Sequence, residues 1–470
     1  ITTMEDDNAI LYHGVGDFDA DGFDDLVIGS PLEDLGGLNQ LEDAGIIVAS
    51  YGSASGLENP TMMHQYTPGI GTRSESGDLF GSALDSGDIN GDGYDDLVVG
   101  VPGEGIARRD RAGAVHVLYG SANGLSGIGS DLLHQNTPGI KSNAETDDAF
   151  GQALAVADID GDGYDDIIVG APGEGVGWGS RARDSAGAVH IIYGSASGLT
   201  GAGSDLFHQN TNGVKSKAET GDAFGEAVTT GDINGDGYDD VVVGVPGEGI
   251  GWGSRARSNA GAVHIIYGSA SGASGVGSQW FYQDTPEWPG RAETNDRFGS
   301  SLAVGDIDGD GVGDLVVGVP GEKLGSYDEA GQVQIRYNPG NWSQTPVAVQ
   351  TLYQNAAGVQ DRVETGDRFG AHLEIANVTG DSGADLIIGI PGESIADHTN
   401  AGAVAIFQNV RGAITTVEDQ ILYADQNVFT GESETGAEFG SWFSVLSGNL
   451  IIGSPGRTVS GLANAGAFYY

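Results

Sequence analysis

Short runs of apolar residues recur along the chain, and each run is bounded by glycine, proline or acidic residues. A typical run is Leu97-Val98-Val99, which is followed directly by Gly100-Val101-Pro102. Runs of this length that are rich in β-branched residues predict β-strands. The 3.6-residue periodicity of an amphipathic helix is absent from the sequence. The pattern therefore predicts an all-β protein built from many short strands.

These strands belong to a repeat of about 70 residues that opens with a Phe-Gly pair. The pairs begin at Phe80, Phe150, Phe224, Phe298, Phe369 and Phe439, and they lie 70, 74, 74, 71 and 70 residues apart. In each repeat a short apolar stretch follows Phe-Gly, and an acidic loop, a Gly-x-Pro run, an Ala-Gly strand and a last stretch come next. Four β-rich stretches per repeat predict four strands.

Two further motifs occur once in each repeat and so give the number of repeats. Gly-x-Pro occurs at Gly29, Gly100, Gly170, Gly244, Gly318, Gly389 and Gly453, and Ala-Gly occurs at Ala44, Ala112, Ala186, Ala260, Ala330, Ala401 and Ala465. Seven four-stranded sheets are best buried by radial packing, so we expect one seven-bladed β-propeller domain over residues 1–470. The expected blades are residues 9–79, 80–149, 150–223, 224–297, 298–368, 369–438 and 439–470. An open solenoid is the alternative, but the sequence lacks the polar caps typical of solenoid ends.

The acidic loop of each repeat has the chemistry of a calcium site. Its first copy runs from Asp17 to Asp25, with carboxylates at alternate positions of a tight turn. Hard cations prefer several oxygen ligands, and Gly22 permits the bend because it has no Cβ. We expect about five calcium ions, held by side chains at loop positions one, three, five and nine and by the carbonyl of position seven. These residues are Asp17, Asp19, Asp21, Phe23, Asp25; Asp88, Asn90, Asp92, Tyr94, Asp96; Asp158, Asp160, Asp162, Tyr164, Asp166; Asp232, Asn234, Asp236, Tyr238, Asp240; Asp306, Asp308, Asp310, Val312 and Asp314.

Two repeats depart from this pattern. The sixth loop offers only Asn377, Thr379, Asp381 and Asp385, with two carboxylates, so we expect it to bind calcium weakly or not at all. In the seventh repeat 14 residues separate Phe439 from Gly453, where the other complete repeats have 20, so the loop is deleted.

The acid at position eight of each loop is expected to fix the turn rather than to touch the ion. Examples are Asp95, Asp165 and Asp239. Gly313 replaces this acid in the fifth loop, and the sequence offers no obvious repair.

The motifs Phe-Gly, Asp-x-Asp/Asn-x-Asp-Gly-x-x-Asp and Gly-Val/Ala-Pro-Gly resemble those of the FG-GAP repeat proteins, a family that includes the integrin α-subunit propellers. The resemblance covers essentially the whole chain. It implies a seven-bladed β-propeller with calcium in the hairpins that join the first and second strands of particular blades. It also implies an extracellular recognition or adhesion role, because the family contains receptors, lectins and bacterial surface proteins.

The charge of the chain limits its partners. The formal net charge is −48, from 67 acidic and 19 basic residues, and the five loops account for only 22 of the acids. Nucleic acid is therefore excluded as a partner, because its phosphates would be repelled. Cysteine is absent, and a calcium-rich medium suggests a secreted or cell-surface protein of a bacterium or archaeon. The apolar runs are too short for a transmembrane segment, and the start at Ile1 suggests that an upstream segment has been removed.

Seven of the 19 basic residues gather in the loops between the second and third strands of three successive repeats, beside two tryptophans. The residues of this candidate ligand surface are Arg108, Arg109, Arg111, Trp178, Arg181, Arg183, Trp252, Arg255 and Arg257. Arginine forks and indole faces suit acidic sugars or an acidic protein surface. The alternative interpretation is that the arginines only pair with nearby acids and relieve repulsion.

The sequence allows more than one way to close the ring. The seventh repeat stops at its third strand, and Ala9-Ile10 stands where the first Phe-Gly pair is expected. Residues 1–8 could close the seventh blade, or a neighbouring chain or a removed segment could donate the strand.

Signs of catalysis are weak. No nucleophile motif or phosphate-binding loop stands apart from the repeat, so we expect no enzyme. His116, His190 and His264 recur at one strand position and are interpreted as satisfied strand residues rather than zinc ligands. The acids that follow Pro-Gly are interpreted as turn residues rather than catalytic acids; they are Glu104, Glu174, Glu248, Glu322 and Glu393.

We therefore expect an extracellular, calcium-stabilised binding or adhesion module that recognises a protein or glycan through the face opposite the calcium loops. One alternative is a structural protein that self-assembles into a surface layer or filament. The other is the non-catalytic propeller part of a larger secreted enzyme.

Overall fold

The computed structural model describes residues 12–36, 41–177, 182–251, 256–285, 288–338, 348–359, 361–380, 383–410, 412–416, 419–426, 429, 431–459 and 466–469. Regular secondary structure within these ranges is entirely β-strand. The strands form seven antiparallel sheets, six with four strands and one with three described strands. The predicted fold class, an all-β seven-bladed β-propeller, is confirmed. The described residues divide into two compact units, residues 12–230 with Ile266–Ser278, and Gly231–Ile265 with residues 279–469.

Strand order follows the chain in every sheet, so each sheet is one repeat. The first three sheets contain β1 (Tyr12–Gly16), β2 (Asp25–Ser30), β3 (Ile46–Tyr51), β4 (Glu58–Met63); β5 (Leu84–Gly87), β6 (Asp96–Val101), β7 (Ala114–Leu118), β8 (Asp131–Leu133); β9 (Ala153–Ala157), β10 (Asp166–Ala171), β11 (Ala188–Ile192) and β12 (Asp205–Phe207). The fourth and fifth contain β13 (Ala227–Gly231), β14 (Asp240–Val245), β15 (Ala262–Tyr267), β16 (Ser274–Phe281); β17 (Ser301–Gly305), β18 (Asp314–Val319), β19 (Gln332–Tyr337) and β20 (Ala348–Leu352). The last two contain β21 (Leu373–Ala376), β22 (Asp385–Ile390), β23 (Ala403–Phe407), β24 (Gln420–Leu422); β25 (Phe443–Leu446), β26 (Asn449–Ser454) and β27 (Ala467–Tyr469).

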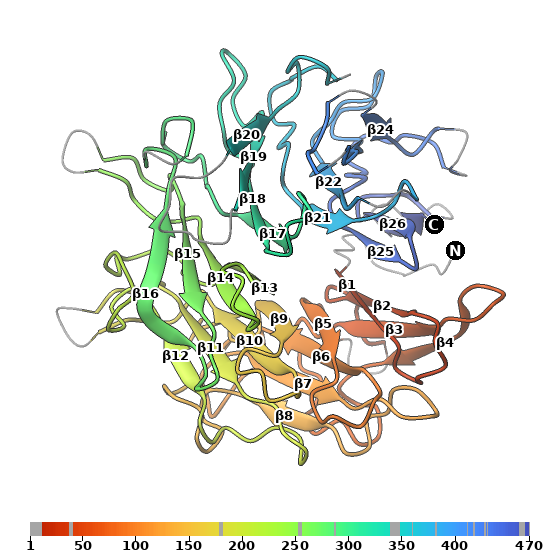
Figure 1. Ribbon diagram of the computed structural model, residues 1–470. Helices are drawn as coiled ribbons and strands as arrows, with labels where there is room; N and C mark the ends of the chain where they lie inside the picture. Colours follow the sequence, from red (N-terminus) through yellow and green to blue (C-terminus); the bar gives the residue numbers. More distant parts are fainter. Residues whose placement is uncertain are drawn as a thin grey trace. The chain divides into compact units, whose positions relative to one another are not determined.

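The second strand of each of the first six blades is the most deeply buried element. All six residues of β2, β6, β10, β14, β18 and β22 are buried. In the unit that holds the first three blades, the first strands β1, β5 and β9 lie next to one another in that order (Figure 1). Because neighbouring strands are antiparallel, the loop between the first and second strands and the loop between the second and third strands lie at opposite ends of each blade.

The Phe-Gly and Ala-Gly marks of the sequence meet between neighbouring blades. Gly113 of the second blade forms a parallel bridge with Phe150 of the third, and the Phe150 amide donates a 3.0 Å hydrogen bond to the carbonyl of Ala112. A Cβ added to Gly100 would lie 2.1 Å from the carbonyl oxygen of Gly151. The glycines therefore recur because neighbouring blades touch through their backbones at these points.

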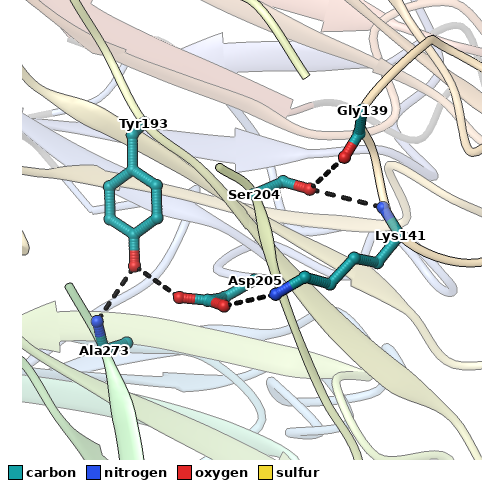
Figure 2. Close-up of polar contacts among 6 residues, drawn as sticks. All are labelled: Gly139, Lys141, Tyr193, Ser204, Asp205 and Ala273. Atoms are coloured by element: carbon teal, nitrogen blue, oxygen red, sulfur yellow. Dashed lines mark hydrogen bonds and ion pairs between the residues drawn. The ribbon is translucent and has the colours of Figure 1, made fainter. Parts of the chain in front are cut away.

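A tyrosine at the end of the third strand joins successive blades through its hydroxyl group (Figure 2). The Tyr193 hydroxyl donates to Asp205 Oδ2 and accepts a hydrogen bond from the Ala273 amide, and both distances are 2.9 Å. Lys141 Nζ lies 2.6 Å from the other carboxylate oxygen of Asp205. Tyr51 and Tyr337 make the same type of bond to the amides of Leu125 and Ile414.

The seventh blade confirms one prediction and leaves another untested. β25 and β26 are joined by Ser447 and Gly448, which have φ angles of 47° and 80°, the positive values of a two-residue type I′ hairpin turn. The calcium loop is thus missing here, as its sequence predicts. The predicted closing strand at the N-terminus falls on residues 1–11, which lie outside the described residues.

Candidate calcium loops and basic loops

Three of the five predicted calcium loops gather their carboxylates tightly. In each loop, oxygen atoms of the first, third and ninth residues lie within 4.8 Å of one another. The three groups are Asp17, Asp19 and Asp25; Asp158, Asp160 and Asp166; and Asp306, Asp308 and Asp314. Carboxylate oxygens are the ligands that calcium prefers, so this donor set fits the ion.

Backbone amides hold the first aspartate of each loop in place. Asp17 Oδ1 accepts a hydrogen bond from the Asp21 amide, and Asp17 Oδ2 accepts one from the Gly22 amide, both at 3.0 Å. Gly22 has a φ of 89° and open space at its Cβ position. The turn therefore needs glycine for its backbone conformation rather than for lack of room.

The ninth aspartate is the buried member of the group. Asp25 is 1% exposed, and its two carboxylate oxygens accept hydrogen bonds from the amides of Phe18 at 2.9 Å and of Gly52 at 2.7 Å. Burial raises the pKa of Asp25 to about 6 and that of Asp166 to about 8. The backbone hydrogen bonds that each carboxylate accepts oppose this rise. A cation between the carboxylates would stabilise their ionised forms.

The other predicted ligands fall into two classes. The fifth-position acid, such as Asp21, lies outside the 4.8 Å carboxylate group and accepts a 3.0 Å hydrogen bond from the Phe23 amide. The second and fourth loops carry asparagine at position three. In the fourth loop, the side-chain nitrogen Nδ2 of Asn234 donates a 3.3 Å hydrogen bond to Asp240 Oδ1. The first and ninth acids of these two loops, and the seventh-position carbonyls of all five, remain predicted ligands.

The sixth loop is arranged differently. The Thr379 hydroxyl donates to Asp385 Oδ2 at 2.9 Å, and the amides of Val378 and Thr379 donate to the same atom. Asn377 accepts from the Gly380 amide, and Asp381 lies outside the described residues. Asp314 of the fifth loop accepts the two equivalent amide bonds, so the Thr379 hydroxyl is the distinguishing donor in the sixth loop, and its weak calcium binding stays a prediction.

The eighth-position aspartate fixes the loop of the neighbouring blade rather than its own turn. Asp95 Oδ2 accepts a 2.9 Å hydrogen bond from the amide of Asp17. The sequence shows no obvious repair for Gly313, but the structure has one. Asn338 Nδ2 donates to the carbonyls of Ile233 and, at 3.2 Å, of Gly313, and thereby joins the fourth and fifth loops.

The basic loops lie at the opposite end of each blade. Two backbone hydrogen bonds close the base of each loop, between Ile106 and Arg109 and between Val176 and Arg183, at 2.9 to 3.0 Å. An equivalent pair joins Ile250 to Arg257. The loops therefore hold an arginine at the same place in each of these three blades, whereas the equivalent position is Tyr327 in the fifth blade and His398 in the sixth.

The described arginines differ in their partners. Arg108 and Arg109 are exposed. Arg111 Nε lies 3.4 Å from Asp147 Oδ1, and Arg257 Nη1 lies 3.4 Å from Asp284 Oδ2. The alternative of charge pairing thus holds for these two residues. Trp178, Arg181, Trp252 and Arg255 lie outside the described residues.

Sequence reasoning missed a buried hydrogen bond at the end of the blades that carries the basic loops. Gln65 Nε2 of the first blade donates to Glu104 Oε2 of the second at 2.6 Å. The same bond joins Gln135 to Glu174, Gln283 to Glu322 and Gln354 to Glu393, at 2.5, 2.7 and 2.6 Å. The acids after Pro-Gly therefore link neighbouring blades. The signal was present in the sequence as a glutamine 39 residues before each acid.

The repeated histidines lie in separate sheets, as predicted. His116 and His190 are fully buried, and burial lowers their pKa values to about 4 and about 3, so both rings are neutral. His116 Nε2 lies 3.0 Å from the Thr72 hydroxyl. The ring nitrogens of His190 have no hydrogen-bond partner among the described residues, and the ring packs edge-on against Phe150.

Five segments match the family model of the FG-GAP repeat, at residues 14–48, 80–118, 150–192, 224–266 and 298–335. Each contains one of the five predicted calcium loops and the strands on either side of it. The chain is an FG-GAP repeat protein. The segments end before the sixth loop, where Asn377 and Thr379 replace acids.

The relatives that match this FG-GAP protein include larger proteins of two kinds. The chain is 36% identical over 166 residues to a phosphatidylinositol-glycan-specific phospholipase D of Bos taurus, covering 35% of this chain and 18% of the relative. The Dictyostelium discoideum protein of that name is 30% identical over 249 residues, 49% of this chain and 25% of the relative. Integrin alpha pat-2 of Caenorhabditis briggsae is 32% identical over 270 residues, 53% of this chain and 18% of the relative. The alignments thus span a quarter or less of these relatives. None of the described residues form a helix long and apolar enough to cross a bilayer.

Proposed function

We propose that this FG-GAP protein is an extracellular, calcium-stabilised binding module that recognises a protein or a glycan through the loops between its second and third strands. The observation that carries the proposal is the repeated, closed base of these loops, which holds Arg109 and Arg183 at equivalent places. Arginine binds carboxylate and sulfate groups through paired N–H donors. An acidic glycan or an acidic protein surface is therefore the expected ligand.

The test is binding of the purified chain, in millimolar calcium, to an array of carboxylated, sulfated and neutral glycans. Replacing Arg109 and Arg183 with serine should abolish binding to the acidic glycans. Arg73→Ser is the matched control, because Arg73 is exposed and lies outside these loops. Unchanged binding by the double variant contradicts the proposed surface, and a wild-type chain that binds none of the glycans contradicts glycan recognition.

The alignments to phosphatidylinositol-glycan-specific phospholipase D favour a second candidate function. In this version the chain is the non-catalytic propeller part of a larger secreted enzyme. Hydrolysis of phosphatidylinositol glycan by this chain alone would contradict the non-catalytic role. No turnover by the chain, with restored turnover after addition of the missing part of the enzyme, would support it.

Self-assembly is a third candidate, favoured by the three described strands of the seventh sheet. A sheet edge without a neighbour accepts a strand from another chain. Light scattering in millimolar calcium separates the candidates, because a mass that stays at 48.0 kDa contradicts assembly and a mass that grows with concentration supports it. We also propose that residues 1–470 form one domain, for which calorimetry should give a single unfolding transition.

A further inference from the structure

The calcium loops of neighbouring blades are joined by a pair of hydrogen bonds. Asp165, at position eight of the third loop, accepts a 2.8 Å hydrogen bond at Oδ2 from the amide of Asp88, the first residue of the second loop. The Asp165 amide donates back to the Asp88 carbonyl at 3.2 Å. Asp95 and Asp17 repeat both bonds between the second and first loops, at 2.9 and 3.3 Å. The residue held in each case is the first expected calcium ligand.

The strands before these loops leave room for the aspartate. A Cβ added to Gly87 would lie 2.4 Å from Asp165 Oδ2, and one added to Gly16 would lie 3.0 Å from Asp95 Oδ2. Before the fourth loop the same position is Gly231, and there the nearest group is the side chain of Val304. The close approach of carboxylate and glycine therefore occurs where position eight is an aspartate.

Blades without this aspartate use a different residue for the same purpose. Position eight is Gly313 in the fifth loop and Ala384 in the sixth, and in these two blades an asparagine follows the third strand. Asn338 Nδ2 donates to the carbonyl of Ile233, and Asn409 Nδ2 donates at 2.6 Å to the carbonyl of Ile307. Both acceptors are the second residues of the preceding loops.

The asparagine and the position-eight aspartate occur in different blades. In the second and third blades the matching position is Gly120 or Gly194, and a Cβ there would lie 2.3 Å from the carbonyl of Asp95 or Asp165. One backbone hydrogen bond is the same in all of these blades. The amides of Gly120, Gly194, Asn338 and Asn409 each donate to the ninth-position aspartate of their own loop, at 2.7 to 3.0 Å. Only the side-chain link to the preceding loop changes.

We propose that Asp95 and Asp165 are positioning residues for the calcium loop of the preceding blade, and that Asn338 replaces them for the fourth loop. This inference rests on the proposed calcium binding. A ligand held in place before the ion arrives binds it more tightly, and residues that hold metal ligands commonly change metal affinity by about 10- to 100-fold. Calcium affinity at one loop thus depends on a side chain of the next blade.

The test is calcium titration of the full chain against a chromophoric chelator, with a double-mutant cycle. Asp165→Ala should weaken one site about tenfold. Asp88→Ala should remove one site, the second loop. In the Asp88→Ala background, the additional change Asp165→Ala should have no further effect, because its target site is already gone. A persistent effect would place Asp165 in its own third loop and overturn the inference.

Three controls separate this role from general effects. Asp165→Asn keeps an acceptor oxygen without the charge, so near wild-type calcium affinity supports positioning, while a loss equal to that of Asp165→Ala contradicts it. Asp184→Ala removes an exposed acid from a loop at the other end of the same blade and should leave every site unchanged. If Asp165→Ala fails to fold, Asn338→Ala tests the fourth loop in the same way, with Asp232→Ala as its background. A wild-type chain that takes up no calcium overturns the proposed function together with this inference.

Discussion

Gln135 Nε2 of the second blade lies 2.5 Å from Glu174 Oε2 of the third, and the two side chains are buried together. Burial, together with the nearby carboxylate of Asp148 and a smaller contribution from Glu145, raises the pKa of Glu174 to about 7. Burial, together with neighbouring carboxylates, likewise raises the pKa of Glu104 to about 8. These acids are therefore largely protonated below neutral pH in the folded chain and ionised in the unfolded chain.

This difference predicts that acid pH stabilises the fold through these acids. Because the folded pKa of Glu174 lies above its ordinary value of 4.5, its contribution is complete below pH 4.5 and is lost as pH rises through about 7. The loss is up to roughly 3 kcal/mol for one group, since one pKa unit corresponds to about 1.4 kcal/mol. Glu174→Gln mimics the protonated acid, so its melting temperature relative to wild type should rise between pH 5 and pH 8. Exposed Glu58→Gln should show no such trend, and a flat difference for Glu174→Gln contradicts the assignment.

Removal of calcium should lower the melting temperature. Extracellular calcium modules bind with dissociation constants on the order of 0.1 to 1 mM, so each filled loop adds about 0.4 to 1.4 kcal/mol in millimolar calcium. Calorimetry with calcium, and again with a chelator, measures the total. Asn377→Ala in the sixth loop is the control variant, because a loop that binds calcium weakly or not at all should leave the calcium-dependent shift unchanged. Equal melting temperatures with and without calcium would contradict structural calcium.

Gly100→Ala should destabilise the fold by about 3 kcal/mol, the upper part of the range for overpacking. Its Cβ would lie 2.1 Å from the Gly151 carbonyl oxygen, so the backbones of two blades would have to separate. Gly105→Ala is the matched control, because the nearest atom to its Cβ is 3.8 Å away and its change should stay within about 0.5 kcal/mol. Denaturant unfolding of both variants measures the difference, and equal stabilities would contradict direct backbone contact.

Tyr193→Phe should cost about 1 kcal/mol, the typical net contribution of one hydrogen bond. The variant removes the hydroxyl between Asp205 and the Ala273 amide and leaves the amide without this acceptor (Figure 2). Tyr327→Phe, with 41% of the residue exposed, should change stability little. Thermal unfolding at one pH and one calcium concentration compares them, and a Tyr193→Phe variant as stable as wild type would show that the hydroxyl contributes nothing.

The sequence predicts the features that repeat in every blade. Phe-Gly, Ala-Gly and the acidic loops occupy fixed places, because backbone contacts between blades and the loop turns tolerate few residue types there. The deleted seventh loop follows from a simple count, since a hairpin between β25 and β26 has room for only Ser447 and Gly448.

Contacts between side chains of different blades are harder to predict from one sequence. Gln65 and Glu104, and Asn338 and Ile233, are brought together by packing between sheets rather than by any local pattern. The replacement at Gly313 is visible in the sequence, but its partner lies 25 residues away after the third strand. Only the register of β18 and β19 places the two side by side.

The closed base of the basic loops allows the loop length to vary while the blade geometry stays the same. The same backbone pair closes two intervening residues between Ile106 and Arg109 and six between Val176 and Arg183, while the strands on either side keep the same pairing. A peptide of chosen sequence inserted between such a pair would leave the sheet beneath it intact. The propeller is therefore a natural display scaffold, on which new recognition loops can be grafted one blade at a time.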